Sequence, residues 1–220
     1  MGACYMIITG GTLKVPFLKE QIDSVQPDYI VCVDGALELL FANGISFDVL
    51  VGDFDTADPE LVLKYREMSA NHKIHFMEYN PKKDYTDTDI ALRYVMEQKP
   101  EKVVILGGTG TRLDHTLANI HLLYQMLPLS QSGYLIDEYN KIYATDCDIT
   151  ISKASQYGEY VSLIPLNDKV EGLTLEGFKY NTRDITLERN VSLGISNEIE
   201  AQEATIRIAS GVLMVIEVKD

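Results

Sequence analysis

Two short segments of the chain concentrate carboxylates beside apolar runs. The segment 52-GDFDT-56 carries Asp53 and Asp55, and the segment 83-KDYTDTD-89 carries three aspartates and two threonines. Two aspartates spaced two residues apart in an extended segment point to the same side, as two ligands of one hard cation would. The clusters therefore indicate a divalent-metal site. A solvated turn followed by a helix cap is the alternative for the first segment.

The second acidic segment also has the pattern of a helix start. Thr86 and Asp89 have the spacing of a capping box, with Asp in place of the usual Glu. This pattern accounts for Asp89 and leaves Asp84 and Asp87 available to a metal or a substrate hydroxyl. Lys83 beside them could contact a phosphate, and a solvated surface lysine is the alternative.

Four apolar runs in the first half of the chain end in glycine or aspartate. Such β-rich runs suit buried parallel strands, and an open parallel sheet binds its ligands where the strands end. The runs are 5-YMIIT-9 before Gly10 and Gly11, 29-YIVCV-33 before Asp34 and Gly35, 49-VLV-51 before Gly52 and Asp53, and 103-VVIL-106 before Gly107 and Gly108. Asp34 therefore joins the candidate metal ligands, with a strand-end turn as its alternative role.

Helical patterns separate these runs at 36-ALELLFANG-44, 59-PELVLKYREMSA-70 and 88-TDIALRYVMEQ-98. Gly44 is placed to close the first helix and Pro59 to open the second. The alternation of strand and helix predicts an open parallel-sheet α/β domain over residues 1–130, and the family resemblance given below implies that this domain binds a nucleotide.

After residue 130 the sequence changes to short segments with alternating hydrophobicity, separated by turn signals. This alternating pattern predicts an antiparallel β-sandwich domain over residues 131–220. The expected strands are 134–137, 148–152, 160–165, 184–188, 204–209 and 212–218.

The run 106-LGGTGTRLDHTLANIHLL-123 reads as a strand end, a glycine turn and a helix, an arrangement that offers backbone N–H groups to an anion. It is neither a Walker A loop nor a GxGxxG motif. The guanidinium of Arg112 would bind a phosphate through its fixed set of N–H donors, and Asp114 would cap the helix. His115 and Asn119 share one helix face. A surface or packing role is the alternative for His115, and hydrogen bonding on the helix face is the alternative for Asn119. The candidate nucleotide-binding residues are Gly107, Gly108, Thr109, Gly110, Arg112, Asp114, His115 and Asn119.

The composition limits the classes of partner. The formal net charge of −14 disfavours nucleic acid and anionic membrane surfaces. The three cysteines have no CxxC spacing, and neither a signal segment nor a membrane span is apparent. We expect a cytoplasmic protein that binds no nucleic acid and no membrane.

The ordered blocks VDGA (33–36), GDFDT (52–56), KDYTDTD (83–89) and LGGTGTRLDHTLAN (106–119), followed by 195-ISNE-198, resemble the thiamine pyrophosphokinase family over nearly the whole chain. The resemblance implies a Mg²⁺-dependent transfer of pyrophosphate from ATP to the hydroxyethyl group of thiamine, which gives thiamine diphosphate and AMP. It also implies a homodimer, with the thiamine pocket where the sandwich of one protomer meets the nucleotide domain of the other.

On this resemblance, the expected metal ligands are Asp34, Asp53, Asp55 and Asp87. We expect Asp87, with Asp84 and Asp34, to form the catalytic group, and Asp87 to orient the hydroxyl or accept its proton. The expected substrate contacts are Lys83, Thr86, Ser196 and Asn197; a polar turn is the alternative for the last two.

The chain departs from the family pattern at Ala36 and Thr111, where glycine is common, and it contains no tryptophan. The aromatic partner of the thiamine ring is therefore open. Two other functions also stay open, a pyrophosphokinase for another alcohol and a non-catalytic nucleotide-binding regulator. The dense carboxylates disfavour the regulator, because like charges repel unless a metal lies among them.

Overall fold

The computed structural model of the chain describes residues 2–55, 57–79 and 84–220. The chain forms two compact units, Met1–Leu122 and Leu123–Asp220, so the division lies slightly before the boundary expected at residue 130. The predicted fold class is confirmed, because an α/β unit with a parallel sheet precedes a unit of antiparallel strands.

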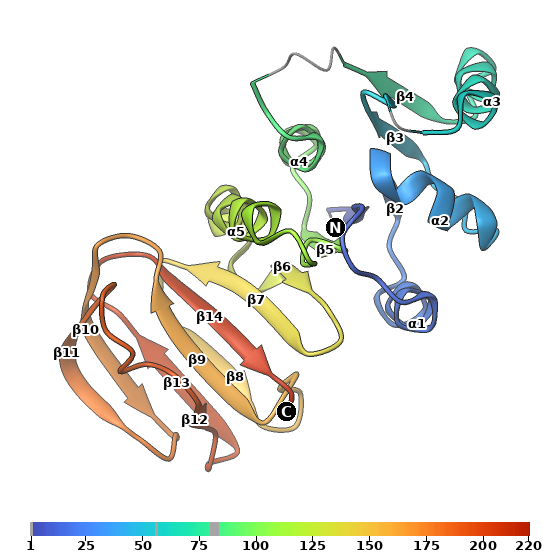
Figure 1. The fold of residues 1–220 in the computed structure, drawn as a ribbon. Coiled ribbons are helices and arrows are strands. Elements are labelled where there is room, and N and C mark those ends of the chain that lie inside the picture. Colours follow the sequence, from blue (N-terminus) through green and yellow to red (C-terminus); the bar gives the residue numbers. More distant parts are fainter. Residues whose placement is uncertain (1, 56, 80–83) are drawn as a thin grey trace. The chain divides into compact units, whose positions relative to one another are not determined.

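The first unit is built on a parallel sheet with the strand order β5-β1-β2-β3-β4. Its strands are β1 Cys4–Ile8, β2 Tyr29–Val33, β3 Val49–Gly52, β4 His75–Glu78 and β5 Lys102–Leu106. Its helices are α1 Val15–Val25, the short η1 Asp34–Ala36, α2 Leu37–Ala42, α3 Pro59–Ala70, α4 Asp87–Glu97 and α5 Leu113–Leu122. Helices α1, α2 and α3 cover one face of the sheet, and α4 and α5 cover the other (Figure 1).

Coverage of both faces explains why the strands read as continuous apolar runs. Helix α4 contacts β1, β2 and β3. The buried stripe of α4 follows the spacing expected for a helix packed on a sheet and consists of Thr88, Ala91, Leu92 and Val95. Thr88 is the polar member of this stripe.

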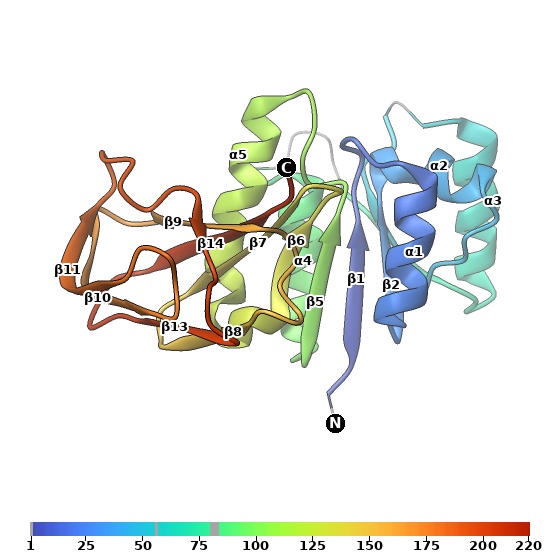
Figure 2. The same cartoon turned by 90° about the horizontal axis from the view of Figure 1, so that it is seen from below.

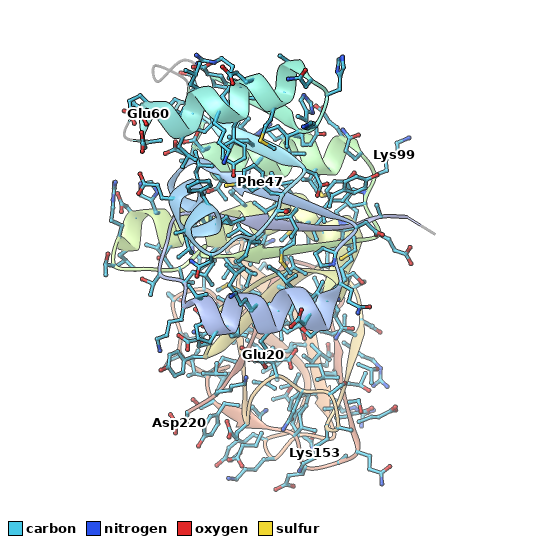
Figure 3. The ribbon with its side chains drawn as sticks, turned by 90° about the vertical axis from the view of Figure 1, so that its right-hand side faces the viewer. Glu20, Phe47, Glu60, Lys99, Lys153 and Asp220 are labelled. Atoms are coloured by element: carbon cyan, nitrogen blue, oxygen red, sulfur yellow. The ribbon has the colours of Figure 1, made fainter. Side chains whose placement is uncertain are left out.

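The strand order creates a switch point between β1 and β5. The chain moves outward from β1 through β2 and β3 to β4, and it then returns to the other side of β1 as β5. Figure 3 shows Glu60, in the first turn of α3, and Lys99, just after α4, at opposite ends of the first unit. The helices thus begin at the edge where the strands end, and ligands bind at this edge of open α/β sheets.

Two predicted helix boundaries are confirmed in this unit. Gly44, with φ of +65°, follows α2, and Pro59 is in the first turn of α3. Asp58 caps α3 by accepting a hydrogen bond from the backbone N–H of Glu60 at 2.9 Å. The sequence analysis did not predict α1 or β4. Strand β4 lies at the edge of the sheet with its residues only partly buried, so it lacks the apolar run of a central strand.

The second unit begins with η2 Leu123–Ser132 and continues as antiparallel strands in two sheets. One sheet of this unit has the order β12-β9-β14-β7-β6, and the other has the order β11-β10-β13-β8. The strands are β6 Gly133–Ile136, β7 Asn140–Thr145, β8 Ile149–Ser152, β9 Tyr160–Pro165, β10 Lys169–Glu176, β11 Thr182–Glu188, β12 Asn197–Glu198, β13 Glu203–Arg207 and β14 Leu213–Val218. The two sheets lie face to face as a sandwich (Figure 2).

The alternation that predicted this sandwich is visible in its burial. In β8 and β13, Ile149, Ile151, Ala204 and Ile206 are buried, and the residues between them are more exposed. The sequence analysis did not predict β7, β10 or β12. In β10 the pairing with β11 shifts register, and Gly172 has φ of +70°, so the apolar alternation is interrupted there.

Candidate functional site

The loops that follow β1 and β5 run side by side at the switch point. The N–H of Gly11 donates to the carbonyl of Gly107 at 2.9 Å, and the N–H of Thr12 donates to the carbonyl of Thr109 at 2.8 Å. A Cβ atom on Gly107 would lie 2.2 Å from the carbonyl oxygen of Thr9, so only glycine allows this approach. The pairing of β1 with β5 therefore continues into a narrow ribbon of two loops.

These loops border a cavity of about 580 Å³ in the first unit. Its volume is within the range of ligand pockets, about 300–1,000 Å³. It is lined by residues 9–12, 33–35, 85–88 and 107–112, together with His115, Thr116 and Asn119 of α5.

Helix α5 fixes the shape of the second loop. The buried side chain of Asn119 donates from Nδ2 to the carbonyl of Gly108 at 2.8 Å. The hydroxyl of Thr116 accepts a hydrogen bond from the N–H of Gly110 at 3.2 Å. Asn119 thus lines the cavity, and it also forms a hydrogen bond from the helix face, which is the role considered as its alternative.

Three of the predicted metal ligands come together at this edge of the sheet. One carboxylate oxygen from each of Asp34, Asp53 and Asp87 lies within 4.8 Å of the others. Asp34 follows β2, Asp53 follows β3, and Asp87 is the first residue of α4. We call these three residues the carboxylate triad. Asp34 and Asp87 also line the cavity.

The electrostatics of the triad favour a bound cation. Burial raises the pKa of Asp34 above its ordinary value, and the negative charges of Asp87 and Asp53 raise it further. The backbone N–H of Phe54 donates to Oδ1 of Asp34 at 3.2 Å and opposes this shift. Converging carboxylates that repel one another offer the oxygen ligands preferred by Mg²⁺ and Ca²⁺.

Asp55 and Asp84 lie outside the triad, and both are exposed. The expectation that Asp53 and Asp55 share one side of an extended segment is wrong. Phe54 between them has φ of +55°, which turns the backbone, and the N–H of Asp55 instead contacts Oδ1 of Asp53 at 3.4 Å. The spacing of two residues aligns side chains only where the backbone is extended.

Arg112 lines the cavity and forms a bidentate ion pair with Asp114. Its Nη2 lies 2.7 Å from Oδ2 of Asp114, and its Nε lies 3.3 Å from Oδ1. The hydrogen bond from Arg112 lowers the pKa of Asp114 to about 2. Because α5 begins at Leu113, Asp114 lies in its first turn and is not the predicted N-cap. His115, in the same turn, lines the cavity as predicted.

The start of α4 combines a cap, an ion pair and an aromatic ring. The hydroxyl of Thr86 accepts from the N–H of Asp89 at 3.2 Å, which confirms the predicted cap. Oδ1 of Asp89 accepts from Nε of Arg93 at 2.7 Å, and the Arg93 guanidinium lies 4.5 Å from the ring centre of Tyr85. Lys83 lies outside the described residues.

In the second unit, the predicted pyrimidine contacts have different environments. Asn197 is buried, and its Nδ2 donates to the carbonyl of Tyr180 at 2.9 Å. Its Oδ1 accepts from the N–H groups of Tyr180 and Glu198 at 3.0 and 2.9 Å. Asn197 therefore has a structural role, but it lies in strand β12 and not in the polar turn considered as its alternative. Ser196 is exposed with φ of +57°, and its N–H donates to Oγ of Ser162 at 3.0 Å.

The sequence analysis missed several residues that line the cavity. It noted that Gly10 and Gly11 end the first apolar run, but it assigned no binding role to residues 9–12. The segment 9-TGGT-12 resembles the loop 107-GGTG-110 in composition and in its place after a strand, and this similarity was an available signal. Tyr85, which is half-exposed at the cavity, was also missed.

Comparisons with known proteins agree on one family. The family model described as thiamin pyrophosphokinase, catalytic domain, matches residues 24–135, and the model described as thiamin pyrophosphokinase, vitamin B1 binding domain, matches residues 146–213. The thiamine pyrophosphokinase of Bacillus subtilis (strain 168) is 33% identical over 186 residues, which cover 84% of this chain and 85% of that protein. Thiamin pyrophosphokinase 1 of Caenorhabditis elegans is 23% identical over 206 residues, which cover 87% and 80%.

Solved structures show the same likeness. The crystal structure of thiamine pyrophosphokinase from Bacillus subtilis has a TM-score of 0.82 at 29% identity and covers 99% of both chains. The thiamin pyrophosphokinase from Geobacillus thermodenitrificans has a TM-score of 0.81 at 28% identity, with 99% and 98% covered. In the described part of this chain, no helix is long and apolar enough to cross a bilayer.

Proposed function

Since this chain belongs to the thiamin pyrophosphokinase family, we propose that it transfers pyrophosphate from ATP to the hydroxyethyl group of thiamine. The products are thiamine diphosphate and AMP. The observation that carries this proposal is the carboxylate triad beside a cavity bordered by two glycine-rich loops. That combination provides a place for a polyphosphate and for the cation that accompanies it.

We propose Mg²⁺ as the cofactor, held by Asp34, Asp53 and Asp87. The donor set fits, because it consists of carboxylate oxygens within 4.8 Å of one another, and hard cations prefer such ligands. The raised pKa of Asp34 also fits, because burial and then the nearby charges of Asp87 and Asp53 make its carboxylate costly to ionise without a cation. Bound Mg²⁺ would neutralise phosphate charge as the transition state develops.

We propose that the cavity binds the ATP polyphosphate through Arg112 and through backbone N–H groups of the loop 107–110. In the structure the guanidinium of Arg112 contacts Asp114, and both side chains are largely exposed. An exposed pair of this kind is weak, so a phosphate can replace Asp114 as the partner of Arg112 at little cost. The N–H of Gly110 already contacts Thr116 and contributes less to this binding.

The chemical step forms one bond and breaks one bond. The thiamine hydroxyl oxygen bonds to the β-phosphorus, the bond from that phosphorus to the α–β bridging oxygen breaks, and its electron pair leaves with AMP. We assign the hydroxyl proton to the carboxylate of Asp87, because this residue lines the cavity and begins α4 beside Asp34 and Asp53.

We further propose that the protein acts in the cytoplasm as a homodimer and that its second unit binds thiamine. The match of residues 146–213 to a vitamin B1 binding domain supports the assignment of thiamine to this unit. The exposed hydroxyl of Ser196 is the better of the two predicted pyrimidine contacts, because the amide of Asn197 is occupied by the backbone of Tyr180.

An assay for AMP tests the reaction. We expect ATP and Mg²⁺ to give AMP and thiamine diphosphate in equal amounts when thiamine is present, and no AMP when it is omitted. AMP formation with another alcohol but not with thiamine would assign a different acceptor. ATP binding without AMP formation in either case would indicate a regulator.

A further inference from the structure

Two buried threonines face each other beside the carboxylate triad. The hydroxyls of Thr9 and Thr88 lie 2.9 Å apart, and either can donate to the other. Thr9 is 8% exposed and Thr88 is 6% exposed, although 79 residues separate them along the chain. Both residues line the cavity.

A hydroxyl at position 88 requires an explanation other than packing. Thr88 belongs to the stripe through which α4 packs on the sheet, and the other members are Ala91, Leu92 and Val95. Valine has the shape of threonine without its hydroxyl, and burying a hydroxyl is costly unless it is hydrogen-bonded. A pair of valines would therefore fill the same space without this requirement.

The hydrogen bond connects a rigid part of the sheet to the residue next to Asp87. The N–H of Thr9 donates to the carbonyl of Leu106 at 2.9 Å, and the carbonyl of Thr9 packs against Gly107, so Thr9 is fixed within the β1–β5 ribbon. Thr88 is in the first turn of α4. A directional bond at this point sets the rotation of that turn, whereas apolar packing leaves it less defined.

We propose that Thr9 and Thr88 are positioning residues, which hold the first turn of α4 so that the carboxylate of Asp87 points toward Asp34 and Asp53. The expected effect on kcat rests on the proposed function. The expected effect on the position of the Asp87 carboxylate does not. Catalytic groups must be held close to their productive geometry, and small displacements have large effects on rate.

A double-mutant cycle with Thr9→Val and Thr88→Val separates positioning from stability. Each single variant leaves one buried hydroxyl without a partner, so both Tm and kcat should fall. The double variant removes both hydroxyls, and its Tm should return toward the wild-type value. Its kcat should nevertheless stay about tenfold below wild type, because the orientation of Asp87 is no longer fixed. Thr88→Ser keeps the hydroxyl and should retain most of kcat.

A second readout does not depend on turnover. Titration with Mn²⁺ alone, followed by its electron paramagnetic resonance signal, should show several-fold weaker binding to the double variant than to the wild type. If the wild type forms no AMP with thiamine, the proposed function fails, and the Mn²⁺ titration still decides the positioning role. Thr145→Val is the matched control, because Thr145 is a buried and hydrogen-bonded threonine of the second unit. It should change Tm without changing kcat or Mn²⁺ binding.

Two results would overturn the inference. One is a double variant whose kcat recovers together with its Tm, since the pair would then act only through stability. The other is equal Mn²⁺ binding by the wild type and the double variant.

Discussion

Asp53→Asn is the most direct test of the carboxylate triad. The substitution keeps the size of the side chain and removes one of three negative charges that lie within 4.8 Å of one another. An amide oxygen can still approach a cation, but it cannot neutralise the cation's charge. Losing one electrostatic contact to a transition state commonly costs about 2.7–4 kcal/mol, or about 10²–10³-fold in kcat. We expect a loss of turnover of that size.

The same geometry predicts how stability should respond. Two unit charges separated by 4.8 Å, the greatest separation of these carboxylate oxygens, repel by about 3.5 kcal/mol at an effective dielectric constant of about 20, and solvent screening of the partly exposed groups reduces this figure. Removing the charge of Asp53 relieves its repulsion with both other carboxylates. The metal-free variant should therefore melt at or above the wild-type temperature while losing turnover, a combination that misfolding cannot produce.

The assay measures initial rates of AMP formation at saturating ATP and thiamine over a range of Mg²⁺ concentrations, with melting curves recorded without metal. Asp23→Asn is the matched control, because Asp23 is an exposed aspartate of α1. Near-normal turnover of Asp53→Asn at saturating Mg²⁺ would refute the triad as the metal site. Equal losses in both variants would refute the specific role of Asp53.

Four further substitutions test neighbouring parts of the site. Asp89→Ala should lower stability by about 0.5–1 kcal/mol, because it removes the i,i+4 ion pair with Arg93 and a negative charge from the first turn of α4, while the backbone N–H of residue 89 still bonds to Thr86. Asp87→Ala should instead reduce turnover with little change in melting. Paired melting and rate measurements that show the reverse pattern would contradict both assignments. The raised pKa of Asp34 means that the metal-free folded state holds this proton more tightly than the unfolded state, so stability should fall as pH rises from the ordinary pKa of an aspartate through the raised value. Asp34→Asn should flatten that slope in metal-free melting curves, and an unchanged slope would contradict the assignment. Arg112→Lys should raise the KM for ATP without changing Tm, because an ammonium cannot reproduce the planar fork and the pair with Asp114 is exposed; an unchanged KM would remove Arg112 from the phosphate site.

The sequence predicted those features of the fold that depend on local pattern. Continuous apolar runs gave the central strands, because a sheet covered on both faces needs apolar residues at every position. The glycines and aspartates after these runs lie together at one edge of the sheet, beside the cavity. Strand β4 was missed because an edge strand with partly buried residues carries no such run, and β10 was missed because Gly172 and a register shift interrupt its alternation.

The residues of the site were harder to place, because their positions depend on single backbone angles and on long-range contacts. Asp55 was grouped with Asp53 on the assumption of an extended segment, and one left-handed residue, Phe54, changes that geometry. Asn197 has the residue type of a ligand contact, but its amide is engaged by the backbone of Tyr180, which no local pattern reveals. The bond between Thr9 and Thr88 joins positions 79 residues apart and leaves no trace in either segment alone.

The triad also shows why its residues come from three separate elements. The carboxyl ends of neighbouring parallel strands meet at one edge of the sheet, so Asp34 after β2 and Asp53 after β3 lie close together whatever their separation along the chain. Asp87 reaches the same edge from α4, which packs on a face of the sheet and begins where the strands end. Burial and this convergence of negative charge together raise the pKa of Asp34, so the site lowers the stability of the metal-free fold. The buried apolar residues of β1, β2 and β3 next to the site contribute burial that opposes this cost.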